Sequence, residues 1–260
     1  MKKIIFITLS LVFIFTSQLF AQKIIKEIQN NGFIRIGTSG NQFPFSFKDE
    51  EGNLQGVDIE LAKDFALEIG VNVKFIELEI DQLIPALINH KIDIILSGFS
   101  ITSKRNTQIL FTDAYYKTGK AILTRIPEIK SGNKKFINKK EITLIVINNS
   151  SSLEFAKANY PEANIITGES IEFCKEVLFS GKADGYIGDY ELCENLFFSD
   201  QNNGDYSFRK ISPSNKQEFI GAAVSPDDYL FFNLINNYLK KIDQKYQNKK
   251  VEEGWLKYAN

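Results

Sequence analysis

The chain has 260 residues, with 31 basic against 32 acidic side chains and a formal net charge of −1. No basic stripe is interleaved with aromatic residues, so the composition argues against a nucleic-acid-binding protein. With 43% hydrophobic residues, the chain is expected to fold as one large domain or two of modest size.

The first 21 residues have the pattern of a secretory signal peptide. A short positive stretch precedes an apolar run, residues 4–15, that is too short to cross a bilayer. Ala21 offers a small residue for cleavage, although Leu19 is larger than the pattern prefers, and an uncleaved N-terminal anchor is the alternative. No cysteine follows the run, so no lipid anchor is expected. Cleavage would remove two lysines, change the net charge to about −3 and leave a periplasmic protein.

The first half of the mature chain predicts alternating strands and helices, which is typical of a parallel sheet. We expect strands at residues 33–39, 72–78 and 92–98, and helices at residues 56–71 and 81–91. Asp58 lies near the start of the first helix, and Asp81 is expected to cap the second. The nearly continuous apolar run of the third strand indicates that both of its faces are covered.

The second half repeats this alternation. We expect strands at residues 141–147, 163–168, 183–189 and 218–225, and helices at residues 150–160, 170–182, 190–198 and 226–246. Two βαβαβ units in series predict two α/β lobes, with a ligand cleft where the carboxyl ends of strands meet helix N-termini. No P-loop, GxGxxG or GxSxG motif occurs, so the sequence contains none of the motifs that would indicate nucleotide binding or an α/β-hydrolase.

Cysteine and histidine are too few to predict a metal site. Cys174 and Cys193 lie in helical patterns, where an oxidising compartment permits a disulfide but two buried thiols are the simpler expectation. His90, the single histidine, is expected at the surface near a helix end. We therefore expect no metal and no cofactor.

The segment "LSGFSITSKR", residues 96–105, places hydroxyl groups and a guanidinium directly after a buried strand. Its polar turn and helix residues are Ser97, Gly98, Ser100, Thr102 and Arg105. Free backbone N–H groups, short hydroxyls and the planar fork of an arginine suit a carboxylate or phosphate. The alternatives are that Thr102 is only a helix cap and that Arg105 is a solvated helix charge.

Asp189 ends an apolar strand in the second half of the chain. It either caps the helix that follows or pairs with a cation in the cleft. Arg105 from one lobe and Asp189 from the other would together hold a ligand that carries both a carboxylate and an ammonium group. An amino acid fits that description.

Segments along nearly the whole mature chain resemble a known family. They include "IRIGTSGNQFPFSF", "GNLQGVDIELAKDFA", "DQLIPALINHKIDIILSGFSIT", "ILFTDAYYKTG" and "GKADGYIGD". The chain resembles periplasmic solute-binding proteins of polar amino-acid ABC importers, the bacterial extracellular solute-binding proteins of family 3. The resemblance implies an α/β fold of two lobes, each a mostly parallel sheet with flanking helices, joined by two hinge strands. The implied divisions are a signal peptide at 1–21, one lobe from 22–118 plus 214–260, the other from 119–213, and crossovers near 117–119 and 213–216.

The resemblance also implies an amino-acid head-group site. Arg105 would hold the α-carboxylate with its two donors, and Ser100 would supply a second donor. Ser97 and Gly98 would lie near the ammonium group, which Asp189 would pair.

Other implied ligand contacts depart from the family pattern. Ser39 falls where many members carry an aspartate that contacts the ligand side chain. Asn149 and Ser150 replace a Gly-Thr pair whose N–H groups face the carboxylate, and asparagine tolerates the left-handed backbone better than most residues. Gln42 and Ile80 stand where aromatic walls usually grip the ligand side chain. Gln42, Ser39 and Asn148 favour a ligand with a polar side chain.

Several aromatic residues near these positions could contact ligand or belong to the cores. They are Phe43, which would have to shift to replace a missing wall, and Phe45, Phe47, Tyr115 and Tyr116. Core packing is the more common role for aromatic residues at such spacings.

We expect a monomeric binding protein without enzymatic activity, which captures an amino acid, closes and presents it to an ABC importer permease. Two alternatives stay open. Secreted dehydratases that act on a prephenate-like acid share this fold and need a cleft acid with a raised pKa; Glu191 is the candidate, although it is expected at the surface or as a cap. The second alternative is a ligand sensor for a membrane signalling partner.

Overall fold

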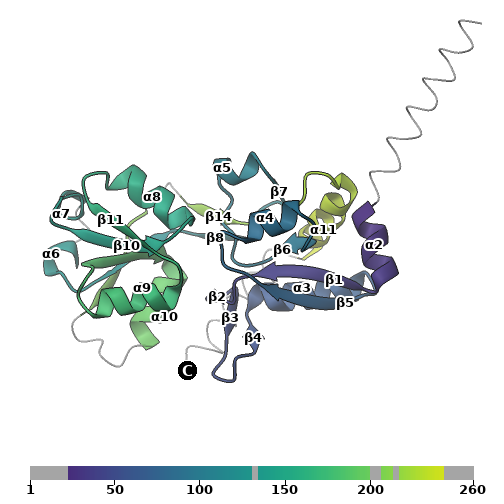
Figure 1. Cartoon of the computed structure of the whole chain (residues 1–260), viewed down its shortest axis with the longest axis horizontal. Helices are drawn as coiled ribbons and strands as arrows, with labels where there is room; N and C mark the ends of the chain where they lie inside the picture. Colours follow the sequence, from purple (N-terminus) through teal and green to yellow (C-terminus); the bar gives the residue numbers. More distant parts are fainter. Residues whose placement is uncertain (1–22, 131–133, 200–205, 213–216, 243–260) are drawn as a thin grey trace, which may run out of the picture.

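The computed structural model describes residues 23–130, 134–199, 206–212 and 217–242 and shows two α/β lobes (Figure 1). The predicted signal peptide, residues 1–21, and the predicted return crossover, residues 213–216, lie outside the described residues. Among the described residues, no helix is long and apolar enough to cross a membrane.

The sheet of the first lobe has the strand order β5-β1-β6-β15-β7. These strands are β1 (Phe33–Thr38), β5 (Asn72–Glu77), β6 (Ile94–Ile95), β7 (Leu110–Phe111) and β15 (Ala223–Val224). β1 pairs in parallel with β5 and β6, whereas β15 runs antiparallel to β6 and β7. A strand from late in the chain is therefore inserted between strands of the first half, and this lobe is built from two separate segments.

Helices cover both faces of this sheet. They are α2 (Lys23–Asn31), α3 (Val57–Glu68), α4 (Leu83–Ile88), α5 (Ser103–Asn106) and α11 (Tyr229–Lys241). Phe65 of α3 packs against Phe231 and Tyr238 of α11 in one core, and α4 contributes Leu83 to a second core beneath the sheet. A small sheet, β2 (Asn41–Gln42), β3 (Ser46–Lys48) and β4 (Leu54–Gln55), extends from this lobe.

Two predicted helix starts were wrong. α4 begins at Leu83 after Gln82, and no side chain caps it, so Asp81 is not its cap. The last helix begins at Tyr229 rather than Pro226 because Asp228 accepts a hydrogen bond from the backbone N–H of Phe231 at 2.8 Å. The third strand is also shorter than predicted, because regular pairing is limited to β6.

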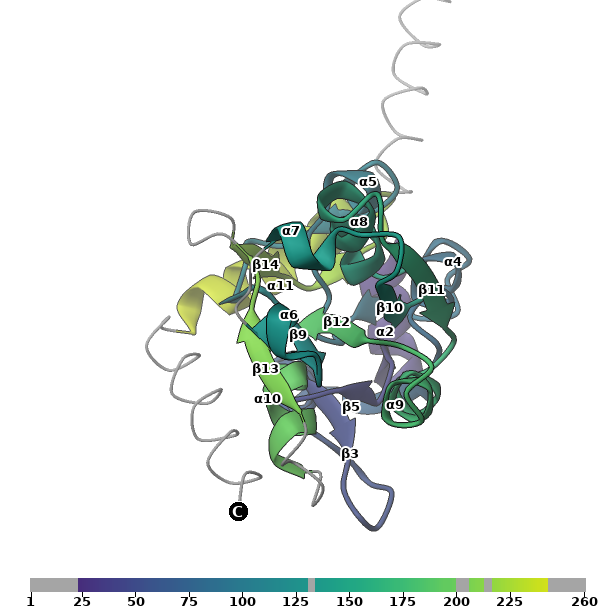
Figure 2. The same ribbon diagram turned by 90° about the vertical axis from the view of Figure 1, so that its left-hand side faces the viewer.

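The sheet of the second lobe has the order β11-β10-β12-β9-β13 (Figure 2). Its strands are β9 (Lys120–Thr124), β10 (Thr143–Ile147), β11 (Asn164–Gly168), β12 (Gly185–Asp189) and β13 (Ser207–Lys210). Its helices are α6 (Pro127–Lys130), α7 (Lys134–Ile137), α8 (Ser151–Asn159), α9 (Ile171–Phe179) and α10 (Tyr190–Ser199). Cys174 and Cys193 are buried as free thiols in this lobe, as predicted.

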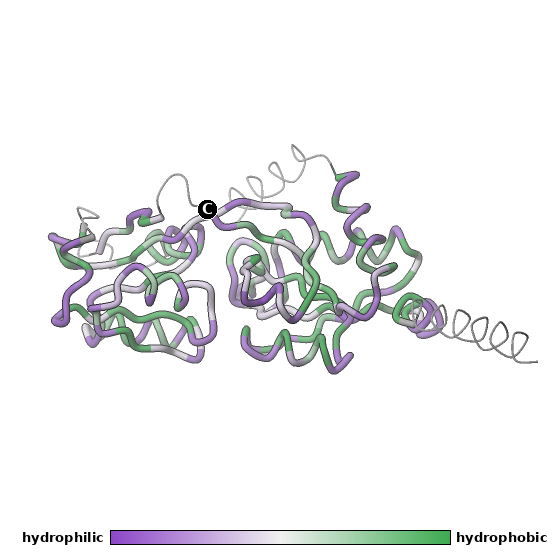
Figure 3. Tube along the Cα trace, turned by 90° about the horizontal axis from the view of Figure 1, so that it is seen from above, coloured by the Kyte–Doolittle hydropathy of each residue, from purple (hydrophilic) through white to green (hydrophobic). Residues whose placement is uncertain are grey.

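The lobes are joined by β8 (Tyr116–Thr118) and β14 (Glu218–Ile220), which pair antiparallel between them (Figure 1). Apolar segments run through each lobe separately (Figure 3). Two lobes with their own cores, joined by a narrow ribbon, can rotate against each other with little change inside either one. The first predicted crossover, residues 117–119, coincides with the end of β8.

Candidate ligand-binding site between the lobes

A narrow cavity lies where the two lobes meet. The first lobe lines it with Gln42, Ile80, Gly98, Ser100 and Arg105, and the second with Ile147, Ser150, Ser151, Ser152, Tyr186, Asp189 and Leu192. Seven of the ten predicted site residues are therefore brought together. The cavity combines hydroxyl groups and charged side chains with an apolar wall, as expected of a site for a small polar ligand.

Arg105 supplies the cation of this cavity. Thr102 caps α5 by accepting a hydrogen bond from the backbone N–H of Arg105 at 3.2 Å, which turns the arginine back toward the cleft. Its Nη1 donates to the carbonyl of Ser100 at 2.8 Å, and its guanidinium carbon lies 3.8 Å from the ring centre of Phe99. The side chain is 7% exposed, and desolvation lowers the pKa of Arg105 to about 10, so the group stays charged at neutral pH. No carboxylate among the described residues forms an ion pair with it.

The turn before Arg105 is held from beneath by Asp58. Gly98 adopts a φ of 58°, and its N–H donates to Asp58 Oδ2 at 2.6 Å. The hydroxyl of Tyr115 donates to both oxygens of Asp58, at 2.8 and 2.9 Å. A Cβ at Gly98 would lie 2.7 Å from the ring of Phe45, so this position requires glycine. Asp58 is fully buried and thus positions the turn of residues 97–100, which we call the head-group turn after its predicted role. The sequence predicted only that Asp58 lies near the start of a helix.

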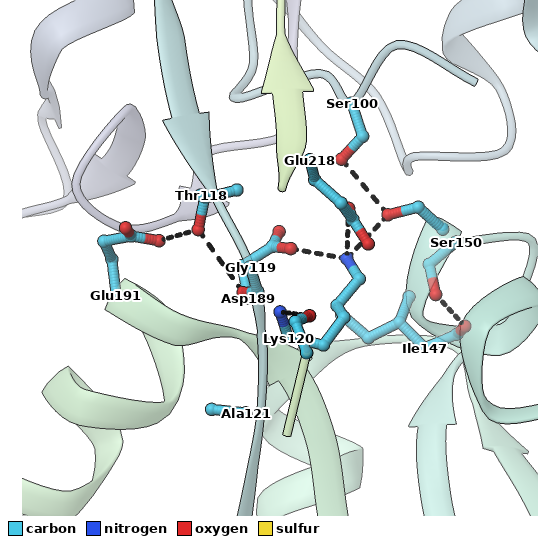
Figure 4. A network of polar contacts seen from close by, with 12 residues as sticks. Ser100, Thr118, Gly119, Lys120, Ala121, Ile147, Ser150, Asp189, Glu191 and Glu218 are labelled. Carbon is cyan, nitrogen blue, oxygen red and sulfur yellow. Dashed lines mark hydrogen bonds and ion pairs between the residues drawn. The ribbon is translucent and has the colours of Figure 1, made fainter. Parts of the chain in front are cut away.

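Asp189 does not stand alone at the end of β12. Lys120 Nζ lies 2.5 Å from Asp189 Oδ1 and 2.9 Å from Glu218 Oε2, and it donates to Ser151 Oγ at 2.8 Å (Figure 4). Lys120 is fully buried; burial alone would lower its pKa, but the two carboxylates raise it above its ordinary value. The predicted ammonium partner is therefore already neutralised in part by a lysine of the same chain.

Sequence reasoning missed Lys120 and Ser151, although each carries a signal. Lys120 begins the otherwise apolar strand β9. A lysine in a fully buried strand almost always pairs with an acidic side chain. Ser151 is the middle serine of the run that opens α8, and its hydroxyl donates across the cleft to Ser100 Oγ at 3.1 Å.

The N-terminus of α8 faces the cavity. Ser150 caps this helix by accepting a hydrogen bond from the N–H of Leu153 at 3.2 Å. Asn149 has a φ of 51°, so the left-handed conformation expected for this position is present. Its side chain points elsewhere and donates to Asp81 at 3.3 Å, outside the cavity.

Two other predicted residues lie beside the cavity rather than in its wall. Ser97 accepts a hydrogen bond from the backbone N–H of Ser39 at 2.9 Å, and the two hydroxyls are also 2.9 Å apart. Ser39 lines a neighbouring groove with Glu77, Glu79 and Glu172, among others. Partial burial and the nearby carboxylates of Asp81, Glu172 and Glu169 raise the pKa of Glu79. This groove is therefore acidic.

The candidate aromatic residues do not line the cavity. Phe43 packs with the core of the second lobe, and Phe47 lies 4.9 Å from it between ring centres. Phe45 and Tyr115 belong to the core of the first lobe. These residues hold the lobes and the head-group turn in place.

Glu191 is buried, which corrects the expectation that it lies at the surface. It is 5% exposed and accepts hydrogen bonds from the hydroxyls of Thr118 and, at 3.0 Å, Tyr116. Burial raises the pKa of Glu191 against the effect of these hydrogen bonds. Since Thr118 and Tyr116 belong to β8, Glu191 ties the second lobe to the hinge, and it does not line the cavity.

The described part of the chain contains no cluster of three or more His, Cys, Asp and Glu side chains suited to a metal ion. His90 lies just past α4 with a φ of 54°, half-exposed and 3.8 Å from Asp227. Among the described residues, the cleft combines the Arg105 guanidinium, which has no ion-pair partner, with a set of hydroxyl groups and a helix N-terminus.

Comparisons with known proteins agree with this architecture. The model of the family "Bacterial extracellular solute-binding proteins, family 3" matches residues 34–258. The chain is 25% identical to ABC transporter arginine-binding protein 1 of Escherichia coli, over 86% of this chain and 90% of that protein. It is also 25% identical to the cyclohexadienyl dehydratase of Pseudomonas aeruginosa, over 90% of this chain and 86% of that enzyme. The arginine-bound, truncated ArgBP of T. maritima is 27% identical, with a TM-score of 0.74 over 84% of this chain and all of that one (100%). This chain belongs to family 3 of the bacterial extracellular solute-binding proteins.

Proposed function

We propose that this protein is an extracytoplasmic receptor that binds an amino acid between its lobes and delivers it to an ABC importer. The observation that carries the proposal is the buried Arg105 guanidinium, which has no carboxylate partner among the described residues. It faces the hydroxyls at the N-terminus of α8, where a ligand carboxylate would be stabilised by both the guanidinium and the helix dipole. Asp189 lies in the same cavity and can accept from the ligand ammonium group.

We further propose a polar ligand of the cationic amino-acid class. The chain's relatives include proteins named for arginine binding, and the groove beside the cavity carries Glu77, Glu79 and Glu172. Lys48 forms an ion pair with Glu77 at 2.7 Å, which leaves more carboxylates than cations among the residues that line this groove. The remaining carboxylates would favour a positive ligand side chain extending from the cavity.

The protein would act in the periplasm, with an ABC importer permease as its partner. Family membership and the predicted signal peptide support a periplasmic location, and the relatives' ABC transporters support a permease as partner. The protein would act as a monomer whose closed form the permease recognises.

Binding calorimetry with the twenty common amino acids tests the proposal. We expect one or more of arginine, lysine and histidine to bind, and Arg105→Ala and Asp189→Ala each to weaken binding by at least about a hundredfold, since charged hydrogen bonds are lost in a buried site. Arg125→Ala, an exposed arginine of the second lobe, is the matched control and should change nothing. Wild-type protein that binds no amino acid, or Arg105→Ala protein with normal affinity, would contradict the proposal.

The second candidate function is a secreted dehydratase. It is favoured by Glu191, a buried carboxylic acid with a raised pKa, because such a group can donate its proton to a hydroxyl that leaves as water. Against it, Glu191 does not line the cavity and is held by the hinge. Incubation with prephenate distinguishes the two functions: turnover that Glu191→Gln abolishes would support the enzyme, and no turnover together with amino-acid binding would support the receptor.

A further inference from the structure

Gln42 joins the two lobes through the cavity. It ends β2 in the first lobe, and its Nε2 donates to Asp189 Oδ2 of the second lobe at 2.8 Å. The side chain is 7% exposed and stands against Gly98, where an added Cβ would lie 3.1 Å from Gln42 Cγ. Gln42 therefore touches both the head-group turn and the predicted ammonium partner.

The orientation of the Gln42 amide follows from its partner. An ionised carboxylate only accepts hydrogen bonds, so the amide nitrogen must face Asp189 and the amide oxygen must point away from it. That oxygen, Oε1, is buried and has no hydrogen-bond donor among the residues that the structure describes. Buried acceptors are nearly always satisfied in folded proteins, so a missing donor indicates a group that arrives with a ligand.

The carboxylate beside Gln42 is already engaged. Lys120 occupies Oδ1 of Asp189, and Gln42 occupies Oδ2. Each Asp189 oxygen has a further lone pair and can still accept from a ligand ammonium group, and Gln42 Oε1 stands beside it as a second acceptor whose hydrogen-bonding capacity is wholly unused.

We propose that Gln42 is a specificity-determining residue whose Oε1 accepts a hydrogen bond from the α-ammonium group of the ligand, while its Nε2 holds Asp189 of the opposite lobe. This inference rests on the proposed amino-acid-binding function and deepens it. One amide thus couples recognition of the ammonium group to contact between the lobes. An acid of the same shape without the amino group leaves Oε1 unsatisfied and is discriminated against.

The test compares Gln42→Met with wild-type protein against two pairs of ligands. The pairs are L-arginine with 5-guanidinopentanoate and L-lysine with 6-aminohexanoate, which differ only by the α-amino group. Gln42→Met should weaken binding of the amino acid by about tenfold to a hundredfold, as expected for a hydrogen bond to a charged group. It should change binding of the matched desamino acid by less than about threefold. Affinities too weak for direct calorimetry are measured by competition with the amino acid.

The controls separate the possible failures. Gln29→Met makes the same exchange on an exposed helix and should alter neither affinity, and Gln42→Ala removes the amide without adding atoms that could clash. Equal losses for both members of a pair, or no loss for either, would overturn the inference while leaving the receptor function intact. Wild-type protein that binds no amino acid would overturn the receptor function and this inference together.

Discussion

The buried charges at the cleft balance one another. Arg105 and Lys120 supply two positive charges, and Asp189 and Glu218 two negative ones, yet only Lys120 pairs with the acids. A zwitterionic ligand would keep this balance, because its carboxylate would neutralise Arg105 and its ammonium group would neutralise the remaining negative charge. The proposed ligand-binding residues are therefore not arranged for greatest stability in the absence of ligand.

Arg105→Met is expected to separate binding from stability. Methionine can keep the packing against Phe99 while removing a desolvated guanidinium. We expect the free energy of unfolding of the ligand-free protein to stay equal or rise by up to about 2 kcal/mol, and binding to be lost. Urea unfolding with and without ligand measures both quantities. A loss of stability greater than about 2 kcal/mol would mean that Arg105 is structural.

Asp58 is expected to make stability depend on pH. Burial raises its pKa from 3.8 to about 7, although the hydrogen bonds from Gly98 and Tyr115 lower it. Between these values the folded protein binds more protons than the unfolded chain, so the free energy of unfolding falls as pH rises toward 7. The contribution of Asp58 should drop by about 2–3 kcal/mol between pH 5 and pH 8. Urea unfolding at both pH values should show a smaller drop for Asp58→Asn than for wild type; equal drops would refute the assignment.

The element that matters most for the proposed carboxylate site is the start of α8. Asn149 takes a left-handed conformation directly before the cap residue Ser150, and the residues of the first turn, Ser150 to Ser152, line the cavity. The chain direction into this helix depends on that one conformation.

Asn149→Gly and Asn149→Ala should therefore differ. Glycine adopts a positive φ without strain, so we expect stability and ligand affinity close to wild type. Alanine does not, and we expect a loss of about 1 kcal/mol in the free energy of unfolding together with weaker binding. Thermal unfolding and calorimetry measure the two effects. Indistinguishable variants would show that the conformation is not needed.

At the scale of the whole molecule, the two lobes contact each other across the cleft. Gln42 to Asp189 and Ser151 to Ser100 are buried bonds across the cleft, and Lys104 to Glu154 is an exposed ion pair at 3.5 Å. The exposed pair is expected to contribute little, because solvent screens it. Closure should therefore depend on the buried contacts and on the ligand.

Ligand binding is expected to make the molecule more compact in solution. Addition of saturating amino acid should lower the radius of gyration measured by small-angle scattering, because the ligand bridges Arg105 and Asp189 and shifts the lobes toward the closed form. It should also raise the free energy of unfolding by about 2.7 kcal/mol at a ligand concentration of a hundred times Kd. Arg105→Ala should show neither change. A decrease in that variant would mean that closure is independent of the head-group site.

Local patterns were enough to predict the lobes and much of the cleft. Alternating strand and helix periodicities located most elements, and Arg105, Ser100 and Asp189 were predicted because polar groups that follow the carboxyl ends of strands, one set in each lobe, lie at the cleft between two α/β units. Two strands were harder to predict: regular pairing of β6 is limited to two residues, and β9, although five residues long, was not predicted. Such elements depend on neighbours rather than on their own sequence.

Residues close together in the chain were enough to predict the fold class, the polar turn within residues 97–105 and the resemblance to a family of binding proteins. Which charges meet depends on the fold. Lys120, Asp189 and Glu218 come from β9, β12 and β14, and Asp58 reaches Gly98 across 40 positions. The energy of a buried charge is set by the groups within a few ångströms of it, and that distance is a property of the fold rather than of the spacing along the chain.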